Sequence, residues 1–270
     1  MIVTIDGRNP IAKLAAELPG AMALFESLGL DYACAGDRSL EDAAHAEGIV
    51  PDDVIAALRR LKHGENKPSW NDRPLCELTR YLVQQHHRFV RDELAHIALR
   101  LADVCSAPEG VPSYLVSLRI AFMKLAAIIL PHLHQEEEEA FRTIEALEKA
   151  WQTSAPHSLG RASTPGEFRA ASSSVSSEFR GTVAAASLGS TLRTLATEHG
   201  AIAAQLRIMR ELRVRLADSD SLSPQCNSVL EDLVTLEAHL HEYIFLENCI
   251  LFPRAAALAE QASADALVSG

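Results

Sequence analysis

The chain has 270 residues, a formal net charge of −11 and 48% hydrophobic residues. The acidic charge argues against a nucleic-acid partner, because phosphate binding needs clustered Lys and Arg, and it disfavours an anionic membrane surface. We expect no membrane span, since uninterrupted apolar stretches stay below ~20 residues, and no signal peptide, since the start lacks a basic and an apolar region. Five scattered cysteines without a Cys-x-x-Cys pair indicate a reduced, cytoplasmic protein.

Residues 1–66 are predicted to form a small helical domain. A first helix should run from Pro10 to Leu28 and end at Gly29. Ser39 begins a capping signature for a second helix, and Pro51 suits the first turn of a third. The polar stretch 63–74, broken by prolines, predicts a linker after this domain.

Residues 75–262 are predicted to form a four-helix bundle, which makes the expected fold class all-α. Four long segments show apolar residues at helical spacing, and strand signals are nearly absent. The expected helices cover 76–105, 113–150, 189–217 and 223–260. The intervening stretch 153–188 is rich in Ser, Ala, Gly and Thr and is predicted to be a flexible loop.

Each of these four helices has a His or Glu side chain, which could bind a metal, on its apolar face. The candidates are His87, His132, Glu136, His199 and Glu247, with Tyr243 one turn before the last. A carboxylate on an apolar face is costly unless something positive meets it there. Imidazole and carboxylate donors without thiolates suit iron, manganese or zinc, and two carboxylates from different helices resemble bridged di-iron sites.

Each candidate also has an ordinary structural interpretation. A single His on an apolar helical face is more often a hydrogen-bonded core residue than a ligand, and the run 136–139 would ordinarily be a solvated face. Tyr243 would usually be an interior aromatic with a bonded hydroxyl. Pro131 and Pro253 should bend or end their helices. The metal hypothesis depends on all four helices contributing together.

Several segments resemble one known family, the iron–sulfur cluster repair proteins of the RIC/ScdA type. The segment Leu246-Glu-Asn-Cys-Ile-Leu-Phe-Pro-Arg-Ala255 is close to the family's LENN-(I/V)-LFPRA ending. His132-x-x-x-Glu136, Thr197-Glu-His199 and Gln85-His-His87 fall where the family has its bundle histidines. Gly29-Leu-Asp-Tyr-Ala-Cys-Ala-Gly-Asp-Arg-Ser-Leu-Glu41 resembles the family's N-terminal motif. The similarity covers nearly the whole chain apart from 153–188.

The resemblance implies an N-terminal ScdA-like domain followed by a hemerythrin-like bundle with a non-haem di-iron centre. Glu136 and Glu247 would be bridging carboxylates, and His87, His132 and His199 terminal ligands. The implied role is a cytoplasmic stress response, in which iron–sulfur proteins damaged by nitric oxide or oxidants are the partners and receive iron. Conventional catalytic turnover is not expected, because no nucleophile–base set, phosphate loop or dinucleotide fingerprint is present.

This sequence departs from the family pattern at three places. The family has His where Tyr243 stands, a His near Cys105, and a Cys-Cys pair where this chain has Ala33-Cys34. Tyr243 either replaces the imidazole as a phenolate ligand, as in catalase haem, or marks weakened binding that leaves a mononuclear or labile site. Cys34 could act as a redox thiol or pair between the subunits of a homodimer. Two other functions stay open: a sensor or binder of O₂, NO or iron, and a metal-free interaction bundle.

Overall fold

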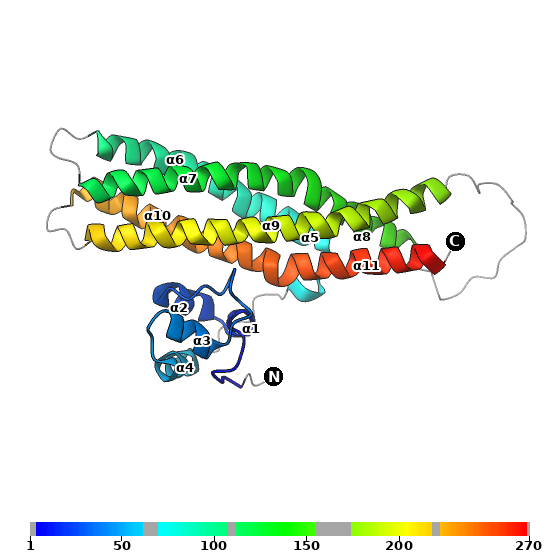
Figure 1. Ribbon diagram of the computed structural model, residues 1–270, viewed down its shortest axis with the longest axis horizontal. Coiled ribbons are helices and arrows are strands. Elements are labelled where there is room, and N and C mark those ends of the chain that lie inside the picture. Colours follow the sequence, from blue (N-terminus) through cyan, green and yellow to red (C-terminus); the bar gives the residue numbers. More distant parts are fainter. Residues whose placement is uncertain (1–3, 62–69, 107–111, 155–173, 218–221, 269–270) are drawn as a thin grey trace, which may run out of the picture.

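The computed structural model describes residues 4–61, 70–106, 112–154, 174–217 and 222–268. The predicted all-α class is confirmed, because within these ranges every regular element is a helix, apart from an isolated bridge between Pro10 and Ser39. A long helical bundle lies beside a small helical unit made by the N-terminal residues (Figure 1).

The small unit contains α1 (Ile11–Glu17), α2 (Ala21–Leu28), α3 (Leu40–Ala46) and α4 (Pro51–Arg60). A single helix was expected over 10–28, but the chain breaks it at Pro19 and Gly20. The proline holds the preceding residue in an extended conformation, and Gly20 takes a φ of 86°. The other end signals are confirmed, since Gly29 caps α2 with a φ of 71° and the Ser39 hydroxyl caps α3.

Gly36 lies where the loop before α3 packs against α1. A Cβ at Gly36 would lie 2.5 Å from the Ala12 Cβ and 2.7 Å from the Tyr32 carbonyl oxygen. We therefore expect Gly36→Ala to lower the free energy of unfolding by about 1–3 kcal/mol in denaturant titrations. Gly200→Ala in the bundle is the matched control, because its Cβ meets nothing within 4 Å and should add about 1 kcal/mol of stability. Equal effects would contradict this packing.

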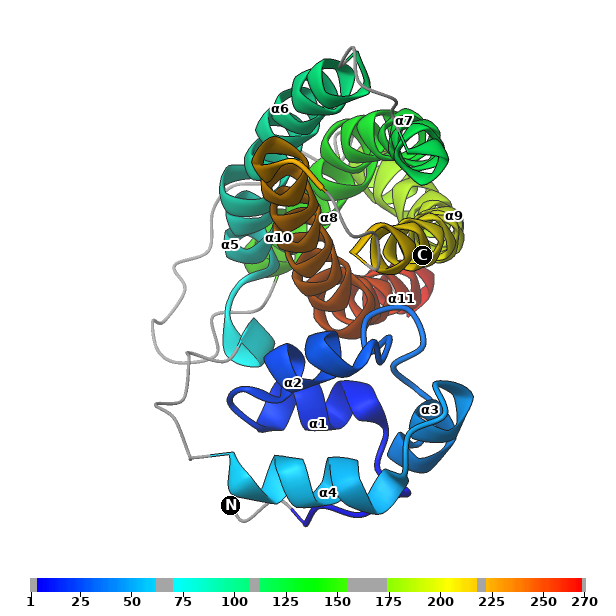
Figure 2. The same cartoon turned by 90° about the vertical axis from the view of Figure 1, so that its left-hand side faces the viewer.

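Four helical runs form the bundle and surround one axis (Figure 2). The first run is α5 (Leu75–Tyr81), η2 (Leu82–His87) and α6 (Arg88–Cys105), after the short 3₁₀ turn η1 (Trp70–Asp72). The second is α7 (Ser113–Gln135), η3 (Glu136–Phe141) and α8 (Arg142–Ser154). The third is α9 (Ser174–Ala217), and the fourth is α10 (Pro224–Leu246), η4 (Glu247–Leu251) and α11 (Phe252–Val268). The segments η2, η3 and η4 are π-helical.

Two predicted boundaries need correction. The flexible loop expected over 153–188 is helical from Ser174 onward, while residues 155–173 lie outside the described part of the chain. The last helix continues to Val268, and Pro253 does not end it. Pro253 is the second residue of α11, so the carbonyl four residues before it belongs to η4. The wider π turn there relieves the clash that a proline ring makes with a preceding carbonyl in an α-helix. Pro131 likewise lies inside α7, which continues beyond it.

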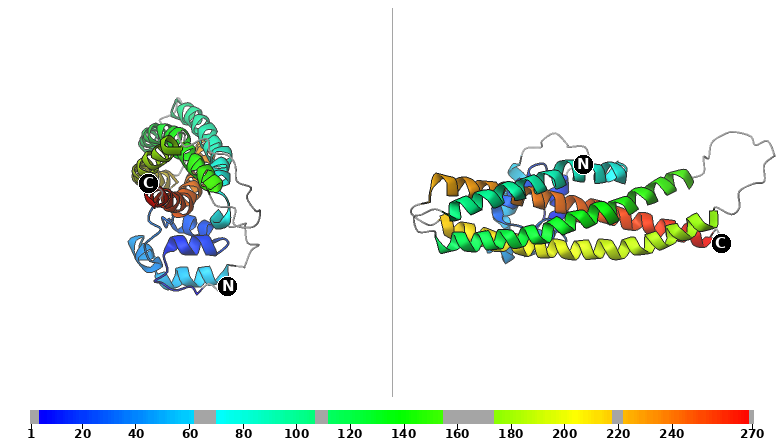
Figure 3. Two further views of the ribbon diagram at one scale, coloured as in Figure 1. Left: turned by 90° about the vertical axis from the view of Figure 1, so that its right-hand side faces the viewer. Right: turned by 90° about the horizontal axis from the view of Figure 1, so that it is seen from above.

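The second run has an unusually apolar outer face. The stretch Ser113–Thr153 contains an 18-residue window of mean hydropathy 1.8, which by length and composition alone is sufficient to cross a membrane, and 33% of that window is buried. In the fold, α7 lies along α9 and beside α6 (Figure 3). Its exposed large hydrophobic side chains are Tyr114, Val116, Ile120, Met123 and Leu130. Two expectations stay predictions: that the protein has no membrane partner, and that it can form a homodimer.

The N-terminal unit contacts α9 and the α10–η4 segment. The Arg210 guanidinium donates to the Gly29 carbonyl at 3.2 Å, and the Asn248 amide donates to the Ala33 carbonyl at 3.0 Å. His241, in α10, forms a 2.8 Å contact with the Glu26 carboxylate. These contacts hold the loop that carries Cys34 against the middle of the bundle.

Candidate metal centre

Three π-helical segments meet at one level of the bundle, and each carries a candidate ligand at one end. His87 is the last residue of η2, Glu136 the first of η3 and Glu247 the first of η4. A π turn takes in an extra residue, which moves the inward face along the sequence, and such turns are frequent at functional sites. At the end of η4 the buried side chain is Leu251, four residues after Glu247, whereas the spacing of three that would bury Ile250 is not used.

Four of the candidates can hold one metal ion. Donor atoms of His132, Glu136, His199 and Glu247 all lie within 4.8 Å of one another, and all four residues are buried. The His132 Nε2 is 2.9 Å from a Glu136 oxygen, and the His199 Nε2 is 3.2 Å from a Glu247 oxygen. Metal bonds of about 2.0–2.2 Å at right angles would place neighbouring donors about 3 Å apart. The observed spacing therefore fits a shared cation.

The donor atoms are close together but are not hydrogen-bonded to one another. Among the described residues, the Nε2 atoms of His87, His132 and His199 have no hydrogen-bond partner, and neither oxygen of Glu247 has one. Buried polar atoms are rarely left unpaired, because their desolvation costs free energy. Short distances without hydrogen-bond angles indicate that these atoms point toward a common centre. This arrangement fits a metal ion bound to all of them.

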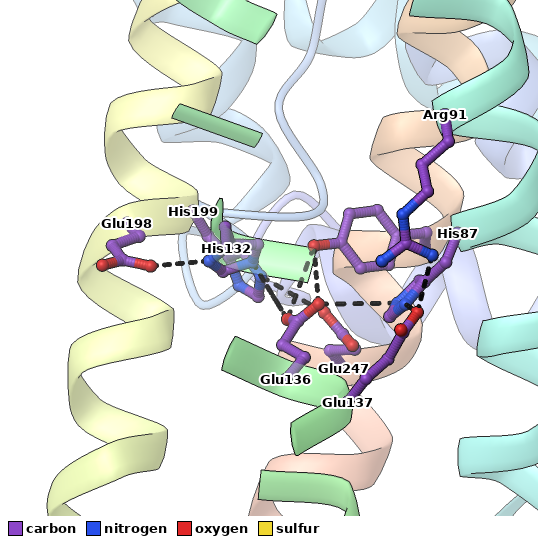
Figure 4. Close-up of polar contacts among 9 residues, drawn as sticks. His87, Arg91, His132, Glu136, Glu137, Glu198, His199 and Glu247 are labelled. Carbon is purple, nitrogen blue, oxygen red and sulfur yellow. Dashed lines mark hydrogen bonds and ion pairs between the residues drawn. The ribbon is translucent and has the colours of Figure 1, made fainter. Parts of the chain in front are cut away.

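The other ring nitrogen of each histidine has a partner that fixes the ring (Figure 4). The Nδ1 contacts are His87 to Glu137 at 2.8 Å, His132 to Glu198 at 2.7 Å, and His199 to Asn248 at 2.9 Å. A carboxylate or amide oxygen accepts a hydrogen bond from the Nδ1–H group, which keeps the proton on Nδ1 and leaves the Nε2 lone pair free for a metal. All three rings are thus oriented as metal ligands require.

Sequence reasoning missed these three orienting residues. Glu137, Glu198 and Asn248 each stand directly beside a candidate ligand in the sequence, which was the available signal. The ordinary structural interpretation of the acidic run 136–139 was a solvated face. Instead, Glu136 is fully buried, and Glu137 binds both His87 and Arg91 at 2.8 Å. The partner of Glu138 is Arg142, so only the later part of the run behaves as an ordinary surface.

Removing an orienting carboxylate should weaken metal binding without unfolding the protein. We expect Glu198→Ala to lower iron affinity about 10–100-fold, because the His132 ring loses its acceptor. The measurement is an anaerobic iron(II) titration against a competing chelator. Glu211→Ala, at an exposed position of the same helix α9, is the control and should bind iron like the unmodified chain. Equal affinities for both variants would argue against His132 as a ligand.

The two buried carboxylates affect one another. Burial and the nearby charge of Glu136 raise the pKa of Glu247 well above its ordinary value. Burial works against ionisation of Glu136 too, but the His132 and His199 imidazoles outweigh it and hold the Glu136 pKa below its ordinary value. For His199, burial is outweighed by both carboxylates, which raise its pKa to about 10. Without a cation the centre cannot easily ionise both acids, whereas a divalent ion would stabilise both charges.

Two further candidate ligands, His87 and Tyr243, also lie beside the Glu136 carboxylate. The His87 Nε2 is 3.5 Å from one Glu136 oxygen, and Figure 4 shows His87 and His132 on opposite sides of this carboxylate. The Tyr243 hydroxyl is buried and lies 3.4 and 3.3 Å from the two Glu136 oxygens. The structure thus brings all six predicted ligands together. Cys105, where the family has a further His nearby, lies at the far end of α6 with its thiol toward the Leu115 carbonyl.

Cys34 lies at the edge of this centre. Its thiol donates to the His199 carbonyl oxygen at 3.4 Å, and the side chain is half-buried. Burial raises the pKa of the Cys34 thiol, and the charge of Asp31 raises it further. A raised pKa disfavours the reactive thiolate. The redox role of Cys34 stays a prediction.

Two comparisons with known proteins give matches. Residues 7–62 match the ScdA_N family, described as a domain of unknown function, DUF542. The protein YtfE of Escherichia coli O1:K1 / APEC, named an iron–sulfur cluster repair protein, is 29% identical over 138 residues, which cover 47% of this chain and 63% of YtfE. The YtfE proteins of Escherichia fergusonii and Escherichia coli O127:H6 match equally. The chain therefore spans less than two thirds of these relatives' length.

Proposed function

We infer that this chain belongs to the RIC/ScdA-type family, which the ScdA_N match and the similarity to YtfE support. On this premise we propose that it binds iron in its bundle for the repair of damaged iron–sulfur clusters. The observation that carries the proposal is the set of buried donor atoms without hydrogen-bond partners among the described residues. Imidazole and carboxylate donors without thiolate suit iron. The partners are iron–sulfur proteins damaged by nitric oxide or oxidants.

The centre has two unequal positions. His132, His199 and the carboxylates of Glu136 and Glu247 would hold one iron, since their donor atoms gather within 4.8 Å. The same carboxylates would bridge to a second iron, whose terminal ligands are His87 and Tyr243. This second position has fewer imidazole donors than the first, so it should release its iron more readily. Iron bound there would be the ion supplied to a cluster-deficient protein.

The incomplete second position favours one alternative function. A centre that holds a single iron firmly would suit a hemerythrin-like binder or sensor of O₂, NO or iron without repair activity. The two functions differ in whether iron leaves the protein. A repair protein must transfer iron to a client, whereas a sensor keeps it.

The test is the reactivation of an iron–sulfur enzyme inactivated by nitric oxide. We expect iron-loaded protein to restore the enzyme's activity in the presence of a chelator that suppresses the effect of free iron(II). The His132→Ala variant, treated with the same iron, should restore much less. If the iron-loaded protein restores no activity while retaining its iron, the repair proposal is wrong and the binder or sensor alternative is favoured.

A further inference from the structure

A second pair of histidines lies beside the candidate metal centre but takes no part in it. His86, in η2, is buried, and among the described residues neither of its ring nitrogens has a hydrogen-bond partner. A neutral imidazole has one N–H donor and one acceptor, so both capacities of this ring are unused. The Nδ1 of His239, in α10, is also buried and unpaired within the described residues. Three unpaired ring nitrogens on neighbouring helices are unusual in a native protein.

The separation of the two rings is compatible with one shared ion. Their centroids are 6.0 Å apart, and the ring planes are inclined by 61°. Metal–nitrogen bonds of about 2.0–2.1 Å put the centroids of two imidazoles on one ion about 5–6 Å apart. For comparison, the centroids of His132 and His199 in the four-donor group are 4.8 Å apart. A water molecule would satisfy some of these nitrogens, but a cation satisfies one on each ring at once.

Aromatic neighbours fix both rings in place. His239 stacks on Phe89 with a centroid distance of 3.9 Å, and His86 packs edge-on against Tyr81 at 5.4 Å. His86 also lies 6.5 Å from the ring of Tyr243, while His239 is half-buried and nearer to solvent. The pair therefore extends from the protein surface to the edge of the main centre. Rings held in this way lose little freedom when an ion binds.

From this geometry we propose that His86 and His239 form a second metal site, which takes one divalent first-row transition ion through two imidazoles, with water completing the coordination. Imidazole donors suit Fe²⁺, Ni²⁺ and Zn²⁺ alike. Because the site lies between solvent and Tyr243, it would hold an ion close to the main centre. The proposal does not depend on repair activity, since it concerns a different pair of ligands.

The experiment counts metal ions after two loading steps. The full chain is saturated with iron(II) without oxygen, desalted, incubated with a small excess of Zn²⁺ and desalted again, and total iron plus zinc per chain is measured by mass spectrometry. The unmodified chain should hold one ion more than His239→Ala and one more than His86→Leu. His45→Ala removes an exposed histidine of α3 near Glu41 and is the matched control, which should lose no ion.

Counting total metal separates this site from the main centre. Zinc that merely displaces iron leaves the total unchanged, so exchange at the main centre cannot imitate the extra ion. Because the site suits Fe²⁺ as well as Zn²⁺, only the total of the two metals is compared between the variants. Equal totals for the unmodified chain, His239→Ala and His86→Leu would overturn the second site, whether or not the main centre holds iron. A loss in His45→Ala as large as in His239→Ala would overturn it as well, because surface histidines would then explain the extra ion.

Discussion

Replacing Glu247 with Gln is expected to change the stability of the metal-free and iron-loaded protein in opposite directions. Without metal, burial and the charge of Glu136 raise the Glu247 pKa, so the folded protein retains a proton that the unfolded chain releases. A neutral amide of the same shape removes this penalty. We expect Glu247→Gln to stabilise the metal-free protein by about 1–3 kcal/mol at neutral pH.

The sign of the pH dependence follows from the same pKa shift. A carboxyl whose folded-state pKa is raised costs stability as pH rises above its ordinary value of 4.5. The advantage of Glu247→Gln should therefore be absent at pH 4 and below, and should grow as pH rises toward neutrality. In iron-loaded protein the substitution removes a negatively charged ligand, so iron affinity should fall at least tenfold. Denaturant unfolding with and without iron measures both effects.

Glu237→Gln is the matched control for this substitution. Glu237 lies in α10, in the same helical run, and is also buried, but it binds the Arg210 guanidinium at 2.9 Å and also contacts Arg213. Its loss leaves the partly buried positive charges of these two arginines unpaired, so the metal-free protein should lose about 1–3 kcal/mol and keep its iron. If Glu247→Gln destabilises the metal-free protein in the same way, then Glu247 has a structural partner and our account of the centre is wrong.

Tyr243→Phe should remove the visible colour of the oxidised, iron-loaded protein. If the phenolate binds ferric iron, it produces a charge-transfer band, as expected for a tyrosinate ligand, and the band disappears with the hydroxyl. Iron content should fall from about two to about one per chain, because the four-donor group that includes His132 and Glu247 is unchanged. The metal-free protein should be little affected, since the hydroxyl makes only long contacts of 3.3 and 3.4 Å to Glu136.

Two further tyrosine variants test the assignment. Tyr81→Phe changes a half-buried tyrosine that contacts His86 rather than the main centre, so the band should survive. Tyr243→His restores an imidazole and should keep about two irons while losing the phenolate band. A band that persists in Tyr243→Phe would show that this tyrosine is not a ligand and that the second position is weakened, as the alternative interpretation holds.

The main features of the bundle could be predicted from sequence because helical periodicity and ligand type are local properties. The predicted helix over 189–217 has a buried apolar face that carries His199, and Leu195 and Ile202 lie on either side of it. The π segments could not be foreseen, since an inserted residue in a turn leaves no distinct pattern in side-chain type. Their effect is seen after Glu247, where Leu251 replaces Ile250 on the buried face.

Contacts between segments that are far apart in the sequence could not be predicted either. The pairing of Glu198 with His132 depends on how α9 lies against α7, and neither helix alone encodes it. The contact of Glu26 with His241 likewise depends on the docking of the N-terminal unit. The break at Pro19, by contrast, was available from the sequence, because a proline followed by a glycine commonly interrupts a helix.

The most direct test of the centre is a crystal structure of the iron-loaded protein with anomalous scattering measured at the iron absorption edge. Our account predicts about two iron peaks in contact with both Glu136 and Glu247, one bound by His132 and His199 and the other by His87 and Tyr243. Absence of iron between these carboxylates, with their side chains hydrogen-bonded to protein groups instead, would contradict it.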